Sequence, residues 1–252
     1  MVKLIYLITR ADDAGCGSAA NRAIVAGLAG GVLKNVSVMV PGPAFLEAAE
    51  MLAGIAGIDL GLHLTLNSEW PMTKWGPVSD AREVPALVDE RGYFYADPEE
   101  TNKRNPPVAQ LMAEAARQLD RARHKSLRIA YLDEHMGVSW LPGFREELKR
   151  FATREGLVFA RRFGSLPWDE PRSGDALARL RGVIGASTRG AMVMVTHPMF
   201  DDASGRQMLR GYAEADRIII EREADRRLWL DERLPAMLAE LGVVPARYSA
   251  VP

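Results

Sequence analysis

Carboxylates and imidazoles recur in this sequence at the ends of apolar runs of the kind that form buried strands. They are Asp12, Asp13, His63, Asp133, His135 and His197. The chain has only four histidines, and His124 alone lies elsewhere, in a helical pattern. One carboxylate with two imidazoles is a common ligand set for a divalent metal ion and leaves coordination positions open. A metal ion in such a set polarises a substrate oxygen and lowers the pKa of a bound water.

The acid and the imidazole left over from such a set are candidates for proton transfer, one as general base and the other as general acid. Spacing alone does not tell which of Asp12 and Asp13 binds metal. Successive strand residues face opposite sides, so the two carboxylates should have different surroundings. The simpler alternative is that one of them caps the following helix, with Ser18 as the competing cap.

Strand-like and helix-like segments alternate along the chain, which predicts a parallel sheet with right-handed crossovers. The expected strands are a first run from Leu4 to the two acids and residues 35–40, 58–66, 128–135, 157–162 and 191–198. The expected helices are residues 18–30, 44–53, 106–124, 142–156, 173–186 and 207–241, the last with a break near Leu230. We therefore expect one α/β domain over residues 1–252, a closed or nearly closed barrel, with an open doubly wound sheet as the alternative. The C-terminal ends of parallel strands meet at one face, so groups far apart in sequence can form one site there.

Residues 67–105 interrupt this alternation with prolines and aromatic residues, which predicts a long loop insertion after the third strand. A short hairpin is expected near residues 84–95. Near the C-terminus, the charged residues between 222 and 227 are expected on a solvated helix face. Cys16, beside the acids, is expected to pack as a small residue.

The composition and charge bear on the possible partners, the disulfide content and the location of the protein. The net charge of −1 gives no indication of nucleic acid or an anionic membrane surface. A single cysteine excludes an internal disulfide framework. No apolar run is long enough to span a bilayer, and the N-terminal residues pass directly into the first strand without a signal-peptide pattern. We expect a cytoplasmic protein.

Four motifs resemble those of the YdjC-like (ChbG-type) carbohydrate deacetylases, and they occur in the same order across nearly the whole chain. They are RADDAG at 10–15 with Asn21 downstream, GLHLTL at 61–66, YLDEHMG at 131–137 and MVTHP at 194–198. The resemblance implies a distorted TIM-like barrel. It also implies hydrolysis of an N-acetyl group from an amino sugar or oligosaccharide with the help of one divalent metal ion, zinc or magnesium.

The resemblance further implies roles for single residues. Asp13, His63 and His135 correspond to the metal ligands of the family. Asp12 corresponds to the catalytic base, and His197 to an acid or oxyanion stabiliser late in the chain.

Substrate contacts are implied less directly. Arg161 is similar in position to an arginine that the family places near substrate, with a surface charge beside Arg162 as an equal alternative. Trp70 and Trp75, with three aromatic residues at 93–95, are candidates for stacking on sugar rings. The alternative is that they pack the loop onto the barrel or across the interface of a homodimer, which the resemblance also suggests.

The sequence departs from the family pattern at three places: Ala14 in place of Phe, no second His in DEHMG, and Met199 in place of Gly. These departures leave the metal ligands intact, but the identity of the sugar substrate stays open. Three rival functions share these residues: a non-haem iron oxygenase, a metal-dependent hydrolase of another amide or ester, and a non-catalytic sugar-binding protein. The βα alternation argues against the first. The presence of both Asp12 and Asp13 argues against the third, because binding alone needs no base.

Overall fold

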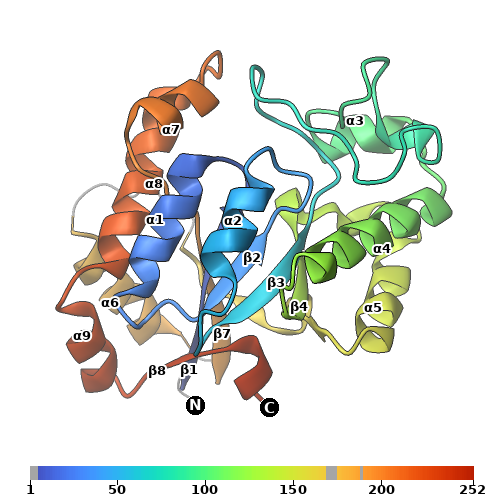
Figure 1. The fold of residues 1–252 in the computed structure, drawn as a ribbon. Helices are drawn as coiled ribbons and strands as arrows, with labels where there is room; N and C mark the ends of the chain where they lie inside the picture. Colours follow the sequence, from blue (N-terminus) through green and yellow to red (C-terminus); the bar gives the residue numbers. More distant parts are fainter. Residues whose placement is uncertain (1–4, 169–174, 188–189) are drawn as a thin grey trace.

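A curled parallel sheet forms the centre of the computed structural model, which describes residues 5–168, 175–187 and 190–252 (Figure 1). Its strands are β1 (Tyr6–Ala14), β2 (Asn35–Val38), β3 (Asp59–Leu64), β4 (Ile129–Glu134), β5 (Val158–Phe159), β6 (Gly164–Ser165), β7 (Ala191–Thr196) and β8 (Val244–Ala246). The strand order is β5-β4-β3-β2-β1-β7-β6, and β8 pairs with β1. Because the sheet curls between its ends, β5 and β6, it forms a half-barrel. The expected distorted TIM-like α/β fold is confirmed.

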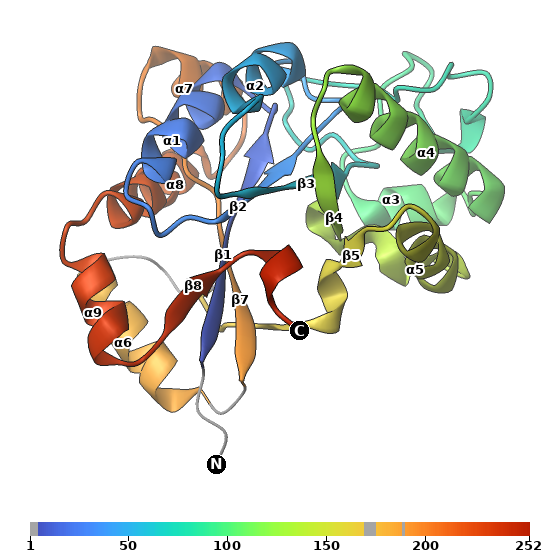
Figure 2. The ribbon, with the colours of Figure 1, turned by 60° about the horizontal axis from the view of Figure 1, so that its bottom comes forward.

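Helices follow most strands, as the alternating pattern predicts. They are α1 (Ser18–Leu28), α2 (Phe45–Leu52), α3 (Pro98–Lys103), α4 (Val108–His124), α5 (Phe144–Arg154), α6 (Ala176–Ala186), α7 (Ala203–Met208), α8 (Ala215–Trp229) and α9 (Leu234–Glu240). Figures 1 and 2 show α1, α2 and α8 on one flank of the sheet and α4 and α5 on the other. The helical pattern of 207–241 divides into α8 and α9 at residues 230–233. Leu4 and residues 173–174, which were expected in a strand and a helix, lie outside the described residues.

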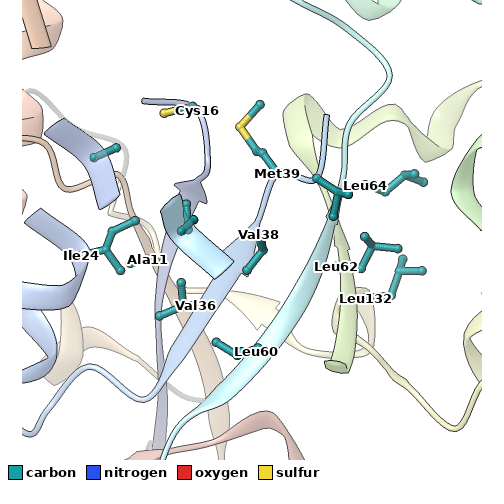
Figure 3. Close-up of a cluster of buried hydrophobic side chains, with 14 of the residues drawn as sticks. Ala11, Cys16, Ile24, Val36, Val38, Met39, Leu60, Leu62, Leu64 and Leu132 are labelled. Carbon is teal, nitrogen blue, oxygen red and sulfur yellow. The ribbon is translucent and has the colours of Figure 1, made fainter. Parts of the chain in front are cut away.

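The two faces of the sheet have different chemistry. On the outer face Leu7, Ala11, Val36, Val38 and Leu62 are buried beneath the helices (Figure 3). The alternate residues of β1 point into the concave side, where Ile8 joins a second apolar cluster and Arg10 and Asp12 follow it. Burying charged groups requires partners, so the strand pattern already places an ionic network inside the half-barrel.

The C-terminal segment fills one end of the concave side. β8 adds to β1 (Figure 2). The short 3-10 turn η4 (Tyr248–Ala250) brings Tyr248 against Tyr131, with ring centroids 4.2 Å apart. Tyr248 Oη also accepts a hydrogen bond from Arg10 over 3.0 Å. The C-terminal segment thus packs against the buried charged residues of β1 and supplies a hydrogen-bond acceptor to Arg10.

Between β3 and α4 the chain contains the 3-10 turn η1 (Pro85–Leu87) and the short helix α3. Within the hairpin expected near 84–95, an isolated antiparallel bridge pairs Val88 with Phe94. Among the described residues, no helix has both the length and the apolar character needed to cross a membrane.

Candidate active site

The two acids of the first motif lie where β1 departs from regular strand geometry. The pairing of β1 with β2 shifts register between Ala11 and Ala14, and Asp13 has a φ of 69°. Such a φ is uncommon for a residue with a side chain. The irregular turn breaks the alternation of a strand and lets both carboxylates reach His63. The helix-capping alternative is wrong, because the N-cap of α1 is Gly17 and no side chain caps it.

Asn21 holds this turn in place. Its Oδ1 accepts a hydrogen bond from the backbone N–H of Gly15 over 2.7 Å, and its Nδ2 donates to Glu47 over 2.8 Å. Gly15 has a φ of 104°, and a Cβ at this position would lie 2.6 Å from the carbonyl oxygen of Met39. Glycine is therefore required at the residue that closes the turn.

Asp13, His63 and His135 converge from the ends of β1, β3 and β4. Asp13 Oδ1 lies 3.5 Å from His63 Nε2 and 3.3 Å from His135 Nδ1, and these two nitrogens are 3.2 Å apart. Ligand atoms bound at about 2.0–2.2 Å to one ion lie roughly 3–3.5 Å from each other. Asp13 Oδ1 is buried without a hydrogen bond. A carboxylate oxygen and two imidazoles in this arrangement fit a divalent metal ion.

A second group, Asp12, His63 and Asp133, also brings three possible ligand atoms together. Here a cation is already present. The guanidinium of Arg10 donates to both oxygens of Asp12 over 2.6 and 2.7 Å and lies 3.1 Å from Asp133 Oδ2. We therefore place the candidate metal centre at Asp13 and not at Asp12.

The two carboxyl groups are kept ionised by different cations. Burial by itself would raise the pKa of Asp12, but Arg10, with smaller contributions from His63 and His197, holds that pKa below its usual value. For Asp13 the opposing cation is Arg222, whose guanidinium lies 2.9 Å from Oδ2, and the pKa of Asp13 is well below its usual value. Both acids are thus anionic near neutral pH.

The pKa values of the two imidazoles are shifted upward, opposite to those of the carboxyl groups. Burial lowers the pKa of His135, but Glu69 and Asp13 outweigh it and raise the pKa to about 9. The same balance, with Asp133 and Asp12 as the main anions, raises the pKa of His63 well above its usual value. Without a metal ion, the site therefore favours protonated imidazoles, and protons must leave before either ring can act as a ligand.

Helix α8 corrects one sequence-based expectation. Arg222 and Asp225 were expected on a solvated face, but Asp225 is 1% exposed, and the Arg222 side chain, 11% exposed, pairs with Asp13. Asp225 Oδ2 accepts a hydrogen bond from the backbone N–H of His197 over 2.8 Å. A positive charge on His197 would contribute to the low pKa of both Asp12 and Asp13, so its ring lies within electrostatic range of the two acids.

Arg161 lies apart from the acids, at the mouth of a cavity on the concave side of the sheet. Its guanidinium donates to Glu134 over 2.6 Å, and its side chain is 41% exposed. The cavity has a volume of about 280 Å³, and its lining includes Arg10, Asp133, Arg145, Arg161 and Tyr248. Arg10 and Asp133 connect it directly to the acids and His63.

The two tryptophans of the insertion are buried. Trp70 and Trp75 are each 3% exposed, which agrees with the packing alternative for both. The ring of Trp70 stands edge-on to Tyr212 with centroids 5.3 Å apart, and the Arg222 guanidinium lies 5.4 Å from its centroid. Trp75 donates from Nε1 to the carbonyl oxygen of Asn67. The Trp70 contacts dock the start of the insertion onto α8 and the segment before it, whereas the Trp75 bond lies within the insertion.

Four residues of this site were missed from the sequence. Arg10 had an available signal, because it is a charged residue inside an apolar strand. Arg222 and Asp225 had a weaker one, since they share a helical stripe with the buried Ile219 and Trp229. Glu69, whose Oε2 lies 3.1 Å from His135 Nε2, had none, because it lies in a segment without periodicity.

Comparisons with known proteins identify the family of this chain. Residues 6–240 match the family model of the YdjC-like proteins. A carbohydrate deacetylase of Thermus thermophilus is 36% identical over 155 residues, which cover 60% of this chain and 52% of that protein. One of Thermoanaerobacter pseudethanolicus is 31% identical over 137 residues, which cover 52% of this chain and 49% of that protein. The chain thus spans about half the length of the curated relatives it matches.

Solved structures show the same fold. A protein of Enterococcus faecalis V583 named for cellobiose-phosphate cleavage superposes with a TM-score of 0.78 at 21% identity, covering 99% of both chains. A CE4 esterase of Streptococcus mutans gives a TM-score of 0.52 at 13% identity, covering 97% of this chain and 85% of that one. The family match extends over most of the chain and includes all four motifs. This chain belongs to the YdjC-like protein family.

Proposed function

We propose that this protein is a metal-dependent carbohydrate deacetylase that hydrolyses the N-acetyl group of an amino sugar or oligosaccharide. One observation carries the proposal: the buried Asp13 Oδ1, which makes no hydrogen bond, faces two imidazole nitrogens while a second ionised acid, Asp12, stands beside them. The names of the relatives supply the substrate class.

In this proposal Asp13, His63 and His135 hold the ion, with zinc and magnesium as the candidates. A divalent ion, when bound, supplies Lewis-acid polarisation of the amide carbonyl and makes a water more acidic. The side chains of the protein carry out the proton transfers. Asp12, which Arg10 keeps ionised, accepts the proton of the attacking water.

The leaving amine must be protonated, because an amide anion is a poor leaving group. We assign the donation of that proton to His197, whose backbone N–H donates a hydrogen bond to Asp225. Arg161, at the mouth of the cavity, is the candidate for contact with the sugar.

The test is acetate release from a panel of N-acetylated mono- and oligosaccharides by the protein as purified, chelated and re-metallated. We expect release that chelation abolishes and one metal restores. Asp12→Asn should keep the metal and lose activity by about 10²–10⁴-fold. Asp13→Asn should lose the metal. Asp59→Asn, at a buried acid whose partners are Ser249 and Arg247, serves as the control.

The outcomes separate the alternatives. A protein that binds metal but releases no acetate would be assigned to another amide or ester, or to sugar binding without catalysis. Loss of metal in Asp12→Asn but not in Asp13→Asn would reverse the roles of the two acids. A protein that binds no metal would contradict the proposal.

A further inference from the structure

Each imidazole of the candidate metal centre has a carboxylate partner outside the ligand trio. His63 Nδ1 lies 2.9 Å from Asp133 Oδ2, while its Nε2 faces Asp13. His135 uses its nitrogens the other way round. Its Nε2 lies 3.1 Å from Glu69 Oε2, while its Nδ1 faces Asp13 Oδ1 over 3.3 Å. The two rings thus turn different nitrogens toward the same point.

The backbone explains this difference. His63 and Asp133 are direct partners in the parallel pairing of β3 with β4, so the nitrogen nearer the backbone, Nδ1, meets the carboxylate of the next strand. His135 follows the end of β4 and begins η2 (His135–Trp140), where Met136 and Gly137 have φ values of 49° and 66°. This turn brings the near nitrogen of His135 to Asp13 and leaves the far nitrogen for Glu69.

Asp133 is an acceptor for three groups. Its Oδ2 faces His63 Nδ1, the hydroxyl of Ser37 at 3.1 Å and the guanidinium of Arg10 at 3.1 Å. An ionised carboxylate can only accept hydrogen bonds. The imidazole nitrogen that faces it must therefore carry a proton, as the arginine and the hydroxyl do. A neutral imidazole has one N–H and one lone pair, so a proton on Nδ1 leaves the lone pair of His63 on Nε2.

We propose that Asp133 and Glu69 are positioning residues that fix opposite tautomers of the two ligand histidines, so that His63 binds metal through Nε2 and His135 through Nδ1. The inference rests on the proposed metal site and goes beyond it. It also gives the insertion a part in the metal centre, because Glu69 is carried by the segment that Trp70 docks onto α8.

The test is a long-range ¹H–¹⁵N correlation spectrum of the protein with ¹⁵N-labelled histidines, titrated with Zn²⁺ and separately with Mg²⁺. The chain has four histidines, so the rings can be assigned by single substitutions. We expect metal-induced shifts at Nε2 of His63 and at Nδ1 of His135. Ligation of both rings through the same nitrogen would overturn this inference and leave the metal site standing. No shift in either ring with either ion would overturn the metal site and the inference together.

Variants provide an independent readout in the affinity of the metal-free protein for Zn²⁺, measured by calorimetry. Glu69→Leu removes the acceptor for His135 and should weaken binding by about 10–100-fold. Glu69→Gln keeps an acceptor oxygen and should stay closer to the wild type. Unchanged affinity and unchanged ring shifts in Glu69→Leu would overturn the role of Glu69.

For Asp133 the matched comparison is with Asp59, a second buried aspartate, which accepts hydrogen bonds from Ser249. Asp133→Leu should weaken Zn²⁺ binding by about 10–100-fold, whereas Asp59→Leu should not change it. Equal affinities in Asp133→Leu and the wild type would overturn the role of Asp133. The wild-type spectrum decides the tautomers even where a variant fails to fold.

Discussion

Arg10 and Asp12, two residues apart on β1, form a buried bidentate ion pair with contacts of 2.6 and 2.7 Å. Their side chains point to the same side because residues i and i+2 of a strand share a face. The pair explains how a carboxylate that is 3% exposed stays ionised and available as a base.

Arg10→Gln should therefore move the acidic limb of the pH profile of kcat/KM to higher pH. One adjacent opposite charge lowers a carboxyl pKa by about 1–3 units, so the shift should be at least about one pH unit. The measurement is acetate release across pH. Arg22→Gln, at an exposed pair with Asp202, is the control and should leave the limb in place. An unmoved limb in Arg10→Gln would mean that Asp12 is not the base that titrates.

Metal affinity should rise with pH. The pKa of His135 is about 9 in the metal-free protein, and metal must displace that proton. Below this pKa the affinity should increase by about one decade per pH unit for each proton released, and it should level off above it. Calorimetric titrations in buffers with different ionisation enthalpies would count the released protons. Affinity that is constant between about pH 6 and 9 would show that metal displaces no imidazole proton in this range, which contradicts the prediction.

Arg222→Gln should strongly destabilise the metal-free protein. It removes the guanidinium that pairs with Oδ2 of the buried Asp13 carboxylate, and breaking a buried pair typically costs about 3–5 kcal/mol. Arg217→Gln on the same helix breaks exposed pairs with Glu214 and Glu221 and should cost at most about 1 kcal/mol. Urea unfolding of both variants tests the contrast. Equal losses would mean that Arg222 does not balance the charge of Asp13.

Gly15→Ala should damage both stability and metal binding. The added Cβ would meet the Met39 carbonyl oxygen at 2.6 Å in a backbone conformation with a φ of 104°. We expect backbone strain to lower the free energy of unfolding by about 1–3 kcal/mol. Gly54→Ala also has a positive φ, 79°, but nothing lies within 4 Å of its Cβ, so its cost should be about 1 kcal/mol and metal binding should be unchanged. Thermal unfolding with and without Zn²⁺ compares the two, and equal effects would exclude a special role for the turn at Gly15.

The sequence by itself predicted the alternating architecture and the convergence of the acids and imidazoles. Apolar runs that end in Asp12, Asp13, His63 and His135 identify strand ends, because strand period and strand length are local properties of the chain. The parallel topology then requires those ends to share one face. The four motifs identified the family for the same reason, since each is a short contiguous stretch of chain.

Only the tertiary structure decided which partners these groups have. Glu69, Arg222 and Asp225 reach the site from a loop without periodicity and from a helix late in the chain, and their contacts depend on how those segments dock. The burial of Trp70 and Trp75 was decided in the same way. The break near Leu230 was predicted from the sequence, but the separation of α7 from α8 was not. Whether buried charges neutralise one another depends on which groups lie close together in the folded protein. Sequence periodicity gives the face of an element, but the distance between charges on different elements is set by packing.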